Sequence, residues 1–245
     1  SAEGLGCVDA GATLDLGKSG VFIRAAHGVA LARMGHHAAQ AFGGVQDAPD
    51  LNECRVIRPQ PAAVTIARSG TLEVCEGAWF VSLRLEADVS VGGAGQGVTT
   101  LNGGDVARVL ATSSASVVEV SGLALQSGAA REGAGARCSG ASLRLSEVEV
   151  SGSAADIYGG GVYADGGCDL ELVNVMLRDN EAGNGGGGLW FSGGALTVDG
   201  GAVSGNSAGS EAGGVGPEAA VSASLDNVDL RNNEATDGGG LVGRA

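Results

Sequence analysis

Residues 177–189 read "LRDNEAGNGGGGL", and residues 230–241 read "LRNNEATDGGGL". Both stretches run from a leucine through a polar turn that contains asparagine into a run of glycines and a second leucine. A motif that recurs at a distance within one chain indicates an internal repeat, and internal repeats are typical of stacked architectures. The repeat therefore bears on the fold class before anything else in the sequence.

The repeating unit has a nearly constant length. The apolar residue that ends each strand pattern recurs at intervals of 27, 26 and 27, and the apolar residue after each glycine run recurs at intervals of 27, 26 and 26. The first series is Val150, Leu177, Val203 and Leu230, and the second is Val162, Leu189, Val215 and Leu241. Two series on one period argue against coincidence. Slightly shorter intervals extend the first series back through Leu125 to Leu101.

Apolar residues alternate within each unit, as in Leu143-x-Leu145 and Val148-x-Val150. This is the period of a β-strand, not of a helix. One unit cannot bury its apolar face alone, but stacked units form a continuous core. The leucine-rich-repeat signature is absent, and a propeller blade needs a longer unit. We therefore predict an all-β parallel β-helix over residues 71–245, a solenoid of about six to seven turns with one turn per unit.

Residues 1–70 lack this register. The stretch "AAHGVALARMGHHAAQAF" (residues 25–42) is rich in alanine and predicts a short helix. The first layer of a coil exposes an apolar end that must be covered. We interpret residues 1–70 as an N-terminal cap that contains this helix, merging into the first irregular turns.

The composition fits a narrow, layered interior. The chain has 46 glycines and only 3% aromatic residues, although 44% of its residues are apolar. Its net charge of −14 disfavours binding to nucleic acid, because an acidic surface repels phosphate. No run of eighteen apolar residues occurs, so we predict no transmembrane segment.

The asparagines and glycines of the repeat have a structural explanation. Asn180, Asn206 and Asn233 fall at one position in successive units. Stacked layers lie about 4.8 Å apart, so amide side chains can hydrogen-bond along the stack as a ladder. The glycines are expected where the coil turns with positive φ or passes close to the next layer.

Five cysteines occur, without any C-x-x-C pair, so a zinc ribbon is not supported. Two disulfides and one free thiol can be assembled in fifteen ways. The pairs that we favour are Cys54 with Cys75 and Cys138 with Cys168, because each pair is separated by roughly one layer.

The glycine runs "GGGV", "GGGL", "AGGV" and "GGGL", preceded by "GTLEVCEGAWFVSLRLEADVSVGGAGQGVTTLNGG", resemble secreted bacterial right-handed parallel β-helix repeat proteins. The layers are similar to polymorphic outer-membrane protein repeats, which pair G-G-A-[ILV] with F-x-x-N. Here the second motif reads Leu177-x-x-Asn180, Val203-x-x-Asn206 and Leu230-x-x-Asn233, with phenylalanine replaced each time. The resemblance implies a right-handed coil and an extracellular or outer-cell-surface location.

Candidate ligand-binding residues are few, and we identify no catalytic residues and no metal site. Asp199 and Asp226 form the only stacked acid pair in the columns compared, and no basic residue stands beside them. We select them as a calcium or sugar contact, with solvated turn acids as the alternative. An exposed Trp190 near Tyr163 could stack on a sugar ring, with plain packing as the alternative.

These observations favour a structural or adhesive module, such as a stalk, a spike or an assembly subunit, and disfavour an enzyme. The alternatives are a polysaccharide-active lyase or glycoside hydrolase, and a non-catalytic module that binds carbohydrate or calcium. An uncovered coil end presents unpaired strand edges. We therefore expect other protein chains or further β-helix turns at the C-terminal end, and polysaccharide is a further candidate partner.

Overall fold

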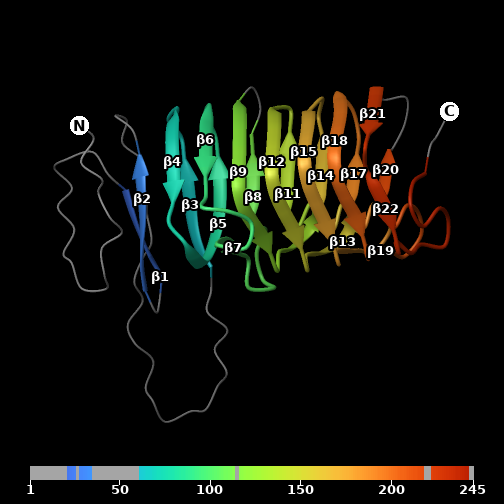
Figure 1. Cartoon of the computed structure of the whole chain (residues 1–245), viewed down its shortest axis with the longest axis horizontal. Coiled ribbons are helices and arrows are strands. Elements are labelled where there is room, and N and C mark those ends of the chain that lie inside the picture. The colour runs from blue at the N-terminus through green and yellow to red at the C-terminus, as the bar shows by residue number, and fades with distance from the viewer. Residues whose placement is uncertain (1–20, 26–27, 35–60, 114–115, 218–221, 243–245) are drawn as a thin grey trace, which may run out of the picture.

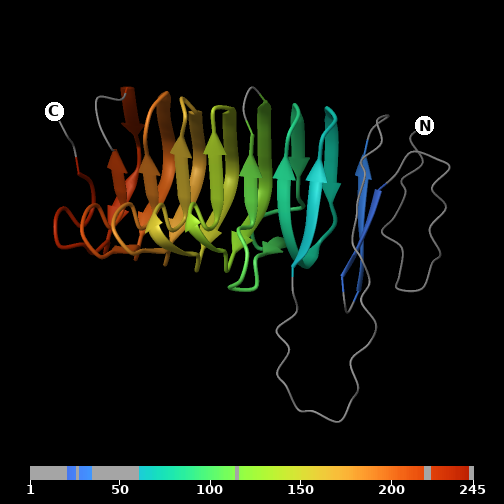
Figure 2. The ribbon, with the colours of Figure 1, turned by 180° about the vertical axis from the view of Figure 1, so that it is seen from behind.

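A computed structural model describes residues 21–25, 28–34, 61–113, 116–217 and 222–242. The described chain is an all-β parallel β-solenoid of about six turns. Its coils follow one another along the long axis of the molecule, from the blue to the red end of Figure 1, and Figure 2 shows the same stack from behind. The expected β-helix is therefore confirmed.

The longest strands of the coil bend in the middle. Each pairs in parallel with its equivalent in the next coil, on both sides of the bend. They are β9 (Val117–Gln126), β12 (Ser142–Ser151), β15 (Asp169–Arg178) and β18 (Ala195–Ser204). In the last coil, β21 (Ser222–Asp226) and β22 (Asp229–Arg231) take the places of the two halves.

Two further sets of parallel strands complete each coil. One set is β3 (Ala62–Ile66), β5 (Gly77–Leu85), β8 (Leu110–Thr112), β11 (Ala136–Ser139), β14 (Val162–Asp165), β17 (Leu189–Phe191) and β20 (Val215–Pro217). The other set is short: β10 (Ala129–Glu132), β13 (Ala154–Tyr158), β16 (Glu181–Ala182) and β19 (Ser207–Ala208). From β9 onward the coils are thus enclosed by three sets of strands that pair with the next layer, and the earlier coils lack the short set.

The N-terminal edge departs from the parallel pattern. β1 (Val21–Ala25) pairs antiparallel with β2 (Gly28–Met34), and β2 pairs antiparallel with β4 (Gly70–Val74). β4 then begins the parallel series with β6 (Val89–Gly92), while β7 (Thr99–Asn102) joins β5 to β9. The helix expected over residues 25–42 is wrong for residues 28–34, because strand pairing with β1 and β4 overrides the helix propensity of alanine. The rest of that stretch, apart from Ala25 in β1, lies outside the described residues.

The apolar series found in the sequence line the interior in single files. Val150, Leu177, Val203 and Leu230 are direct partners in adjacent coils. The second series is equally in register. Most members of both series are buried; Leu177 of the first and Leu189 of the second are 1% and 0% exposed. Each buried aliphatic side chain contributes roughly 1.5–3 kcal/mol, which is the main stabilisation of the stack.

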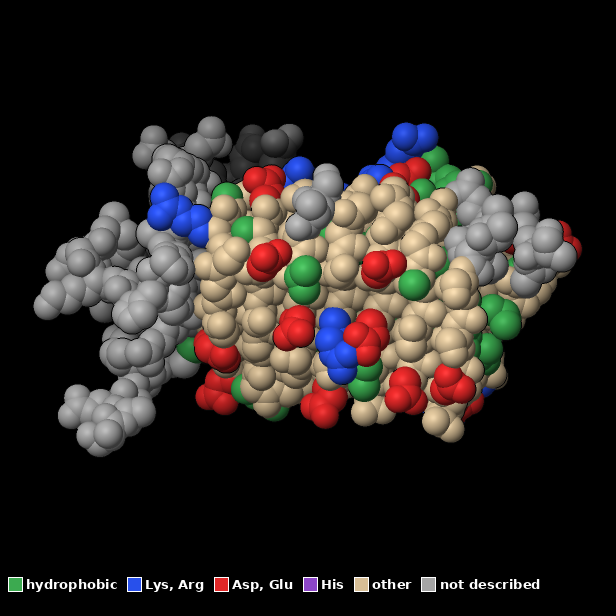
Figure 3. Space-filling model, turned by 90° about the horizontal axis from the view of Figure 1, so that it is seen from above, with side chains coloured by type: hydrophobic (Ala, Val, Ile, Leu, Met, Phe, Trp, Pro, Cys, Tyr) green, Lys and Arg blue, Asp and Glu red, His purple; other side chains and the backbone are tan. Residues whose placement is uncertain are grey.

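The corners of the coil repeat in register as well. Each long strand bends at a residue with positive φ. These residues are Gly122, Glu147, Asn174 and Gly200, followed by Asn227 in the last coil. Glycine and asparagine adopt this conformation most readily, so their recurrence follows from the turn. The face of the molecule in Figure 3 is mostly uncharged, with acidic side chains and a few basic ones scattered over it.

A substitution at Gly188 can show whether stability depends on the close approach of neighbouring layers at the glycine runs. A Cβ atom at this position would lie 2.7 Å from the carbonyl oxygen of Gly214 and 3.2 Å from Asn206 Nδ2. We expect Gly188→Ala to lower the free energy of unfolding by about 1–3 kcal/mol, because backbone atoms must shift to admit the methyl group. Denaturant unfolding measures the change. Gly97→Ala is the control, since a Cβ there meets no atom within 4 Å; equal stability of the two variants would contradict the prediction.

Candidate functional site

The interior of the coil contains a ladder of asparagine side chains. Asn180 Nδ2 donates to Asn206 Oδ1 at 3.0 Å, and Asn206 Nδ2 donates to Asn233 Oδ1 at 3.0 Å. The backbone N–H groups of Asn180 and Asn206 donate to the same two oxygens. Asn180 and Asn206 are 1% and 0% exposed. These amides are therefore buried but satisfied, which removes the penalty for burying them.

Each ladder amide also ties its coil to the previous one through the backbone. Asn180 Nδ2 donates to the carbonyl of Val150, and Asn206 Nδ2 donates to that of Leu177, both at 2.9 Å. Asn233 Nδ2 repeats the contact with Val203 at 2.8 Å. Each Nδ2 thus supplies one hydrogen bond across the layers in addition to the ladder itself.

Glycines of the preceding coil face the ladder. A Cβ atom at Gly161 would lie 3.0 Å from Asn180 Nδ2, and one at Gly214 would lie 3.1 Å from Asn233 Nδ2. Gly188 stands in the same relation to Asn206. The carboxamide therefore fills the space that a side chain on these glycines would need. The repeated motif pairs asparagine with glycine for this reason.

Ser153 begins the ladder one coil before Asn180. Its backbone N–H donates to Asn180 Oδ1 at 3.1 Å, and its hydroxyl accepts from the N–H of Gly128 at 3.1 Å. Ser153 is 0% exposed. A hydroxyl can thus occupy the ladder position, with Gly135 as the glycine that faces it.

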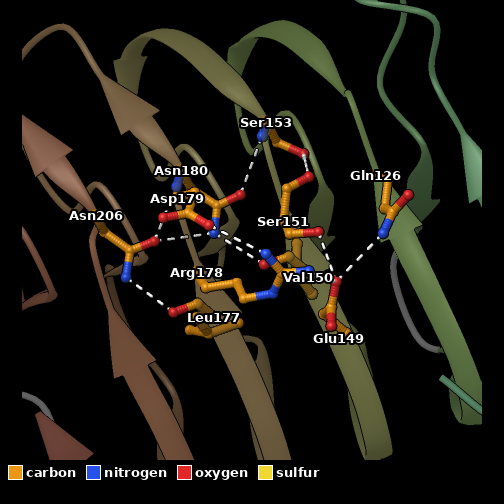
Figure 4. Close-up of polar contacts among 10 residues, drawn as sticks. All are labelled: Gln126, Glu149, Val150, Ser151, Ser153, Leu177, Arg178, Asp179, Asn180 and Asn206. Carbon is orange, nitrogen blue, oxygen red and sulfur yellow. Dashed lines mark hydrogen bonds and ion pairs between the residues drawn. The ribbon is translucent and has the colours of Figure 1, made fainter. Parts of the chain in front are cut away.

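An ion-pair network lies beside the start of the ladder (Figure 4). Glu149 Oε1 accepts hydrogen bonds from Arg178 Nη2 at 2.7 Å, from Ser151 Oγ at 2.8 Å and from Gln126 Nε2 at 3.2 Å. Arg178 Nη1 also contacts Asp179 at 3.1 Å. These residues come from β9, β12 and β15 and from the turn after β15, so the network crosses three successive coils. The repeat pattern does not predict this network, because Glu149 and Arg178 are 29 residues apart and do not share a register position.

The network shifts the pKa values of its charged members. Burial alone would raise the pKa of Glu149, but the hydrogen bonds from Arg178, Ser151 and Gln126 together outweigh burial and hold it below its ordinary value. The hydrogen bond to Glu149 raises the pKa of Arg178. Glu149 is therefore a buried carboxylate that stays ionised in the folded chain.

The aromatic pair selected as a sugar platform is buried. Trp190 and Tyr163 are partners in adjacent coils, but they are only 3% and 8% exposed. Trp190 stacks on Tyr158 with ring centroids 4.6 Å apart, and Arg137 lies over the Tyr163 ring at 5.4 Å. The expectation of an exposed Trp190 is wrong, because its ring lies against Gly185, which has no side chain to hold it away. Plain packing, the alternative reading, describes both rings.

Asp199 and Asp226 are direct partners on β18 and β21, as the register predicted. Ser224 Oγ donates to Asp226 Oδ2 at 2.8 Å. Across the described residues, no group of three His, Cys, Asp or Glu side chains is placed to hold a metal ion. A calcium or sugar contact at this pair stays a prediction.

A shallow groove crosses the first halves of β9, β12, β15 and β18. Glu119, Arg144 and Glu171 are neighbours in one file of its lining, and Arg144 forms an ion pair with Glu171. Asp169 also lines it. The structure thus places Arg144 among carboxylates. Its file lies two residues before the file of Asp199 along the strands. The sequence signal for this file is the spacing of Glu119, Arg144 and Glu171, which follows the period of the repeat.

The disulfides lie partly within the described chain. Cys138 and Cys168 form a disulfide, and both are 0% exposed. It joins β11 to the turn before β15 in the next coil. Cys75 is also disulfide-bonded, and its partner lies outside the described residues. Cys54 lies outside them too, so the Cys54–Cys75 pair stays a prediction.

Comparisons with protein-family models, with curated proteins and with solved structures give no match for this chain. Among the described residues, no helix is long and apolar enough to cross a membrane.

The ladder predicts a graded response at Asn206. Asn206→Ala removes the acceptor of the Asn180 amide and backbone N–H groups, so buried donors lose their partners. We expect unfolding free energy to fall by about 2–4 kcal/mol, with cavity formation adding to the loss. Asn206→Ser should lose less, because Ser153 shows that a hydroxyl fits this file. Equal losses in both variants, measured by denaturant unfolding, would contradict a hydrogen-bonding role.

Glu149 predicts a pH dependence of stability. Since its pKa is lower in the folded chain, its contribution is fully present above the unfolded value near 4.5 and is lost as the pH falls through the folded value. Glu149→Gln should therefore destabilise the chain at pH 7 and flatten the loss of stability on acidification. Unfolding curves from pH 7 to about pH 3 measure this. The exposed Glu181 supplies the matched control Glu181→Gln, and equal pH profiles of the two variants would contradict the prediction.

Proposed function

We propose that the chain is a structural module of the extracellular space or the cell surface, such as a stalk, a spike or an assembly subunit. The observation that carries this proposal is the asparagine ladder, because it joins successive coils through buried hydrogen bonds that no ligand needs to complete. The polar residues that recur in the interior thus serve cohesion between layers. This is what a rigid, protease-resistant element requires.

Two further features support this location. Cys138–Cys168 and Cys75 are disulfide-bonded, and disulfides persist in oxidising environments such as the extracellular space. The net charge of −14 favours solubility at high local concentration. Adhesion would then depend on the outer side chains, which vary between coils.

The second candidate is binding or cleavage of a polysaccharide. It is favoured by the groove that contains Glu119, Arg144, Asp169 and Glu171, because carboxylates beside a cation can bind hydroxyl groups and act as acid or base. Such a groove also lies where an extended chain could cross several strands. A calcium-dependent variant of this candidate would use the Asp199 and Asp226 pair.

A polysaccharide panel separates the candidates. We expect no cleavage of neutral or acidic glycans and no retention on them, with or without calcium, because the recurring polar groups serve the coil. Product formation and affinity electrophoresis are the measurements. Cleavage or retention that is lost in Asp199→Ala or Arg144→Gln, but kept in the exposed control Arg231→Gln, would overturn the structural assignment.

A further inference from the structure

Three arginines meet on the outer face of the strand set that contains β5, β8 and β11. Arg84 and Arg137 are two coils apart in one outward file, and Ala111 lies between them in register. We call these three residues the basic file. Arg108 stands in the turn before β8 and reaches the next coil, where its guanidinium donates to two backbone carbonyls. The small side chain of Ala111 leaves the arginines around it uncovered.

Arg84 is the most accessible arginine of the basic file. Its side chain is 61% exposed, against 30% for Arg137. Arg84 forms an ion pair with Glu86, which is also exposed, and exposed pairs are weak because water screens them. A carboxylate of another molecule can therefore compete with Glu86 for this guanidinium.

Arg108 has no carboxylate partner of its own among the described residues. Burial lowers its pKa, and the charges of Arg137 and Arg84 lower it further, which places the three guanidinium groups near one another. Glu132 and Asp165 counter this effect, but both form ion pairs with Arg137. This surface is thus balanced in charge, on a chain whose net charge is −14.

A second outward file has the complementary pattern. Glu181 and Glu234 are two coils apart on the short strand set, with Ser207 between them in register. This set, of which β13 and β19 are labelled, lies along the lower side of the coil in Figure 1. Both carboxylates are exposed, and a shallow hollow of about 430 Å³ crosses all three positions. We call these three residues the acidic file. Glu181 lies between Ala154 and Ser207 in the stack, so its exposure is a property of this face.

The two files match because both follow the rise of one coil. In each, like charges stand two layers apart, about 9.6 Å at about 4.8 Å per layer, with a small residue between them. The spacing is equal whatever the exact rise, and each pattern reads the same in both directions. Glu119 and Glu171 have this spacing too, but Arg144 stands between them and forms an ion pair with Glu171. That file would place a third arginine against the basic file.

The net charge of the chain limits where two copies can meet. Two chains of −14 repel each other at long range. At 0.15 M salt the Debye length is about 8 Å, so charges in direct contact matter most. The balanced surface around the basic file is a place where a second acidic chain meets little repulsion. Since exposed ion pairs are individually weak, we expect association only at high protein concentration.

We propose that copies of this chain associate side by side, with the basic file of one copy against the acidic file of another. Glu181 and Glu234 of one copy then face Arg84 and Arg137 of the other, and Arg108 gains a carboxylate nearby. The two files occupy different faces of the coil, so the contact joins unlike surfaces. The proposal rests on the assembly role within the proposed function and specifies the partner as a second copy.

Sedimentation equilibrium of the full chain tests this contact. At 0.15 M NaCl we expect self-association at concentrations up to about 1 mM. Arg84→Glu should weaken it about tenfold, because like charges then face each other. Arg231→Glu is the matched control, since Arg231 is 60% exposed and paired with Asp229 outside both files, and it should associate as the unsubstituted chain does. A chain that stays monomeric, or equal association of the two variants, would overturn the proposal.

A charge swap separates a specific contact from a loss of fold. Glu181→Arg combined with Glu234→Arg should also weaken self-association and leave the melting temperature unchanged, since both side chains are exposed. An equimolar mixture of this double variant with Arg84→Glu should associate more tightly than either variant alone, because the reversed files carry opposite charges. A mixture that associates no better than its components would contradict the contact.

The contact and the structural role can fail separately. The polysaccharide panel measures glycan cleavage and retention, which do not depend on self-association. A monomeric chain that binds no glycan would overturn the contact and leave the structural role standing. Cleavage of a glycan by a chain that associates as expected would overturn the structural role instead.

Discussion

The fit of a buried carboxamide against a glycine of the preceding coil is the constraint on which the central layers depend. Asn206 needs Gly188 to make room, and Gly188 leaves a void unless a compact polar group fills it. The carboxamide must then bond both neighbouring layers, because a buried amide without partners would cost several kcal/mol. The nearly constant period of the repeat follows, since each coil must return the two residue types to the same register.

This constraint makes the stability of the stack collective. Asn206 donates to Asn233 in the next coil and accepts from Asn180 in the previous one, so its loss leaves unpaired groups in both neighbouring coils. The aliphatic files behave in the same way, since Leu177 packs between Val150 and Val203. Nearest-neighbour coupling of this kind is the behaviour expected of a solenoid. The Glu149 network adds a lateral connection across three coils near the first ladder residue.

Features that recur with the repeat could be predicted from the sequence, whereas contacts between residues without a fixed spacing could not. The files of Val150 and Val162, the ladder and the Cys138–Cys168 pair depend on register, which the spacing of apolar residues contains. Burial of Trp190 depends on Gly185 and Tyr158, whose spatial relation to the ring has no fixed spacing. The Glu149 network joins residues from different register positions. The strand at 28–34 arises from pairing with β4, which local propensity does not contain.

Residues that bind a ligand are therefore expected at the outer positions, where the residue type varies from coil to coil. The interior files admit few residue types, so they are committed to cohesion, whereas the outer file that contains Glu119, Arg144 and Glu171 changes charge from coil to coil without disturbing the core. A ligand that crosses several coils would contact one side chain of this file in each coil. The outer file can thus vary independently of the interior files that hold the coils together.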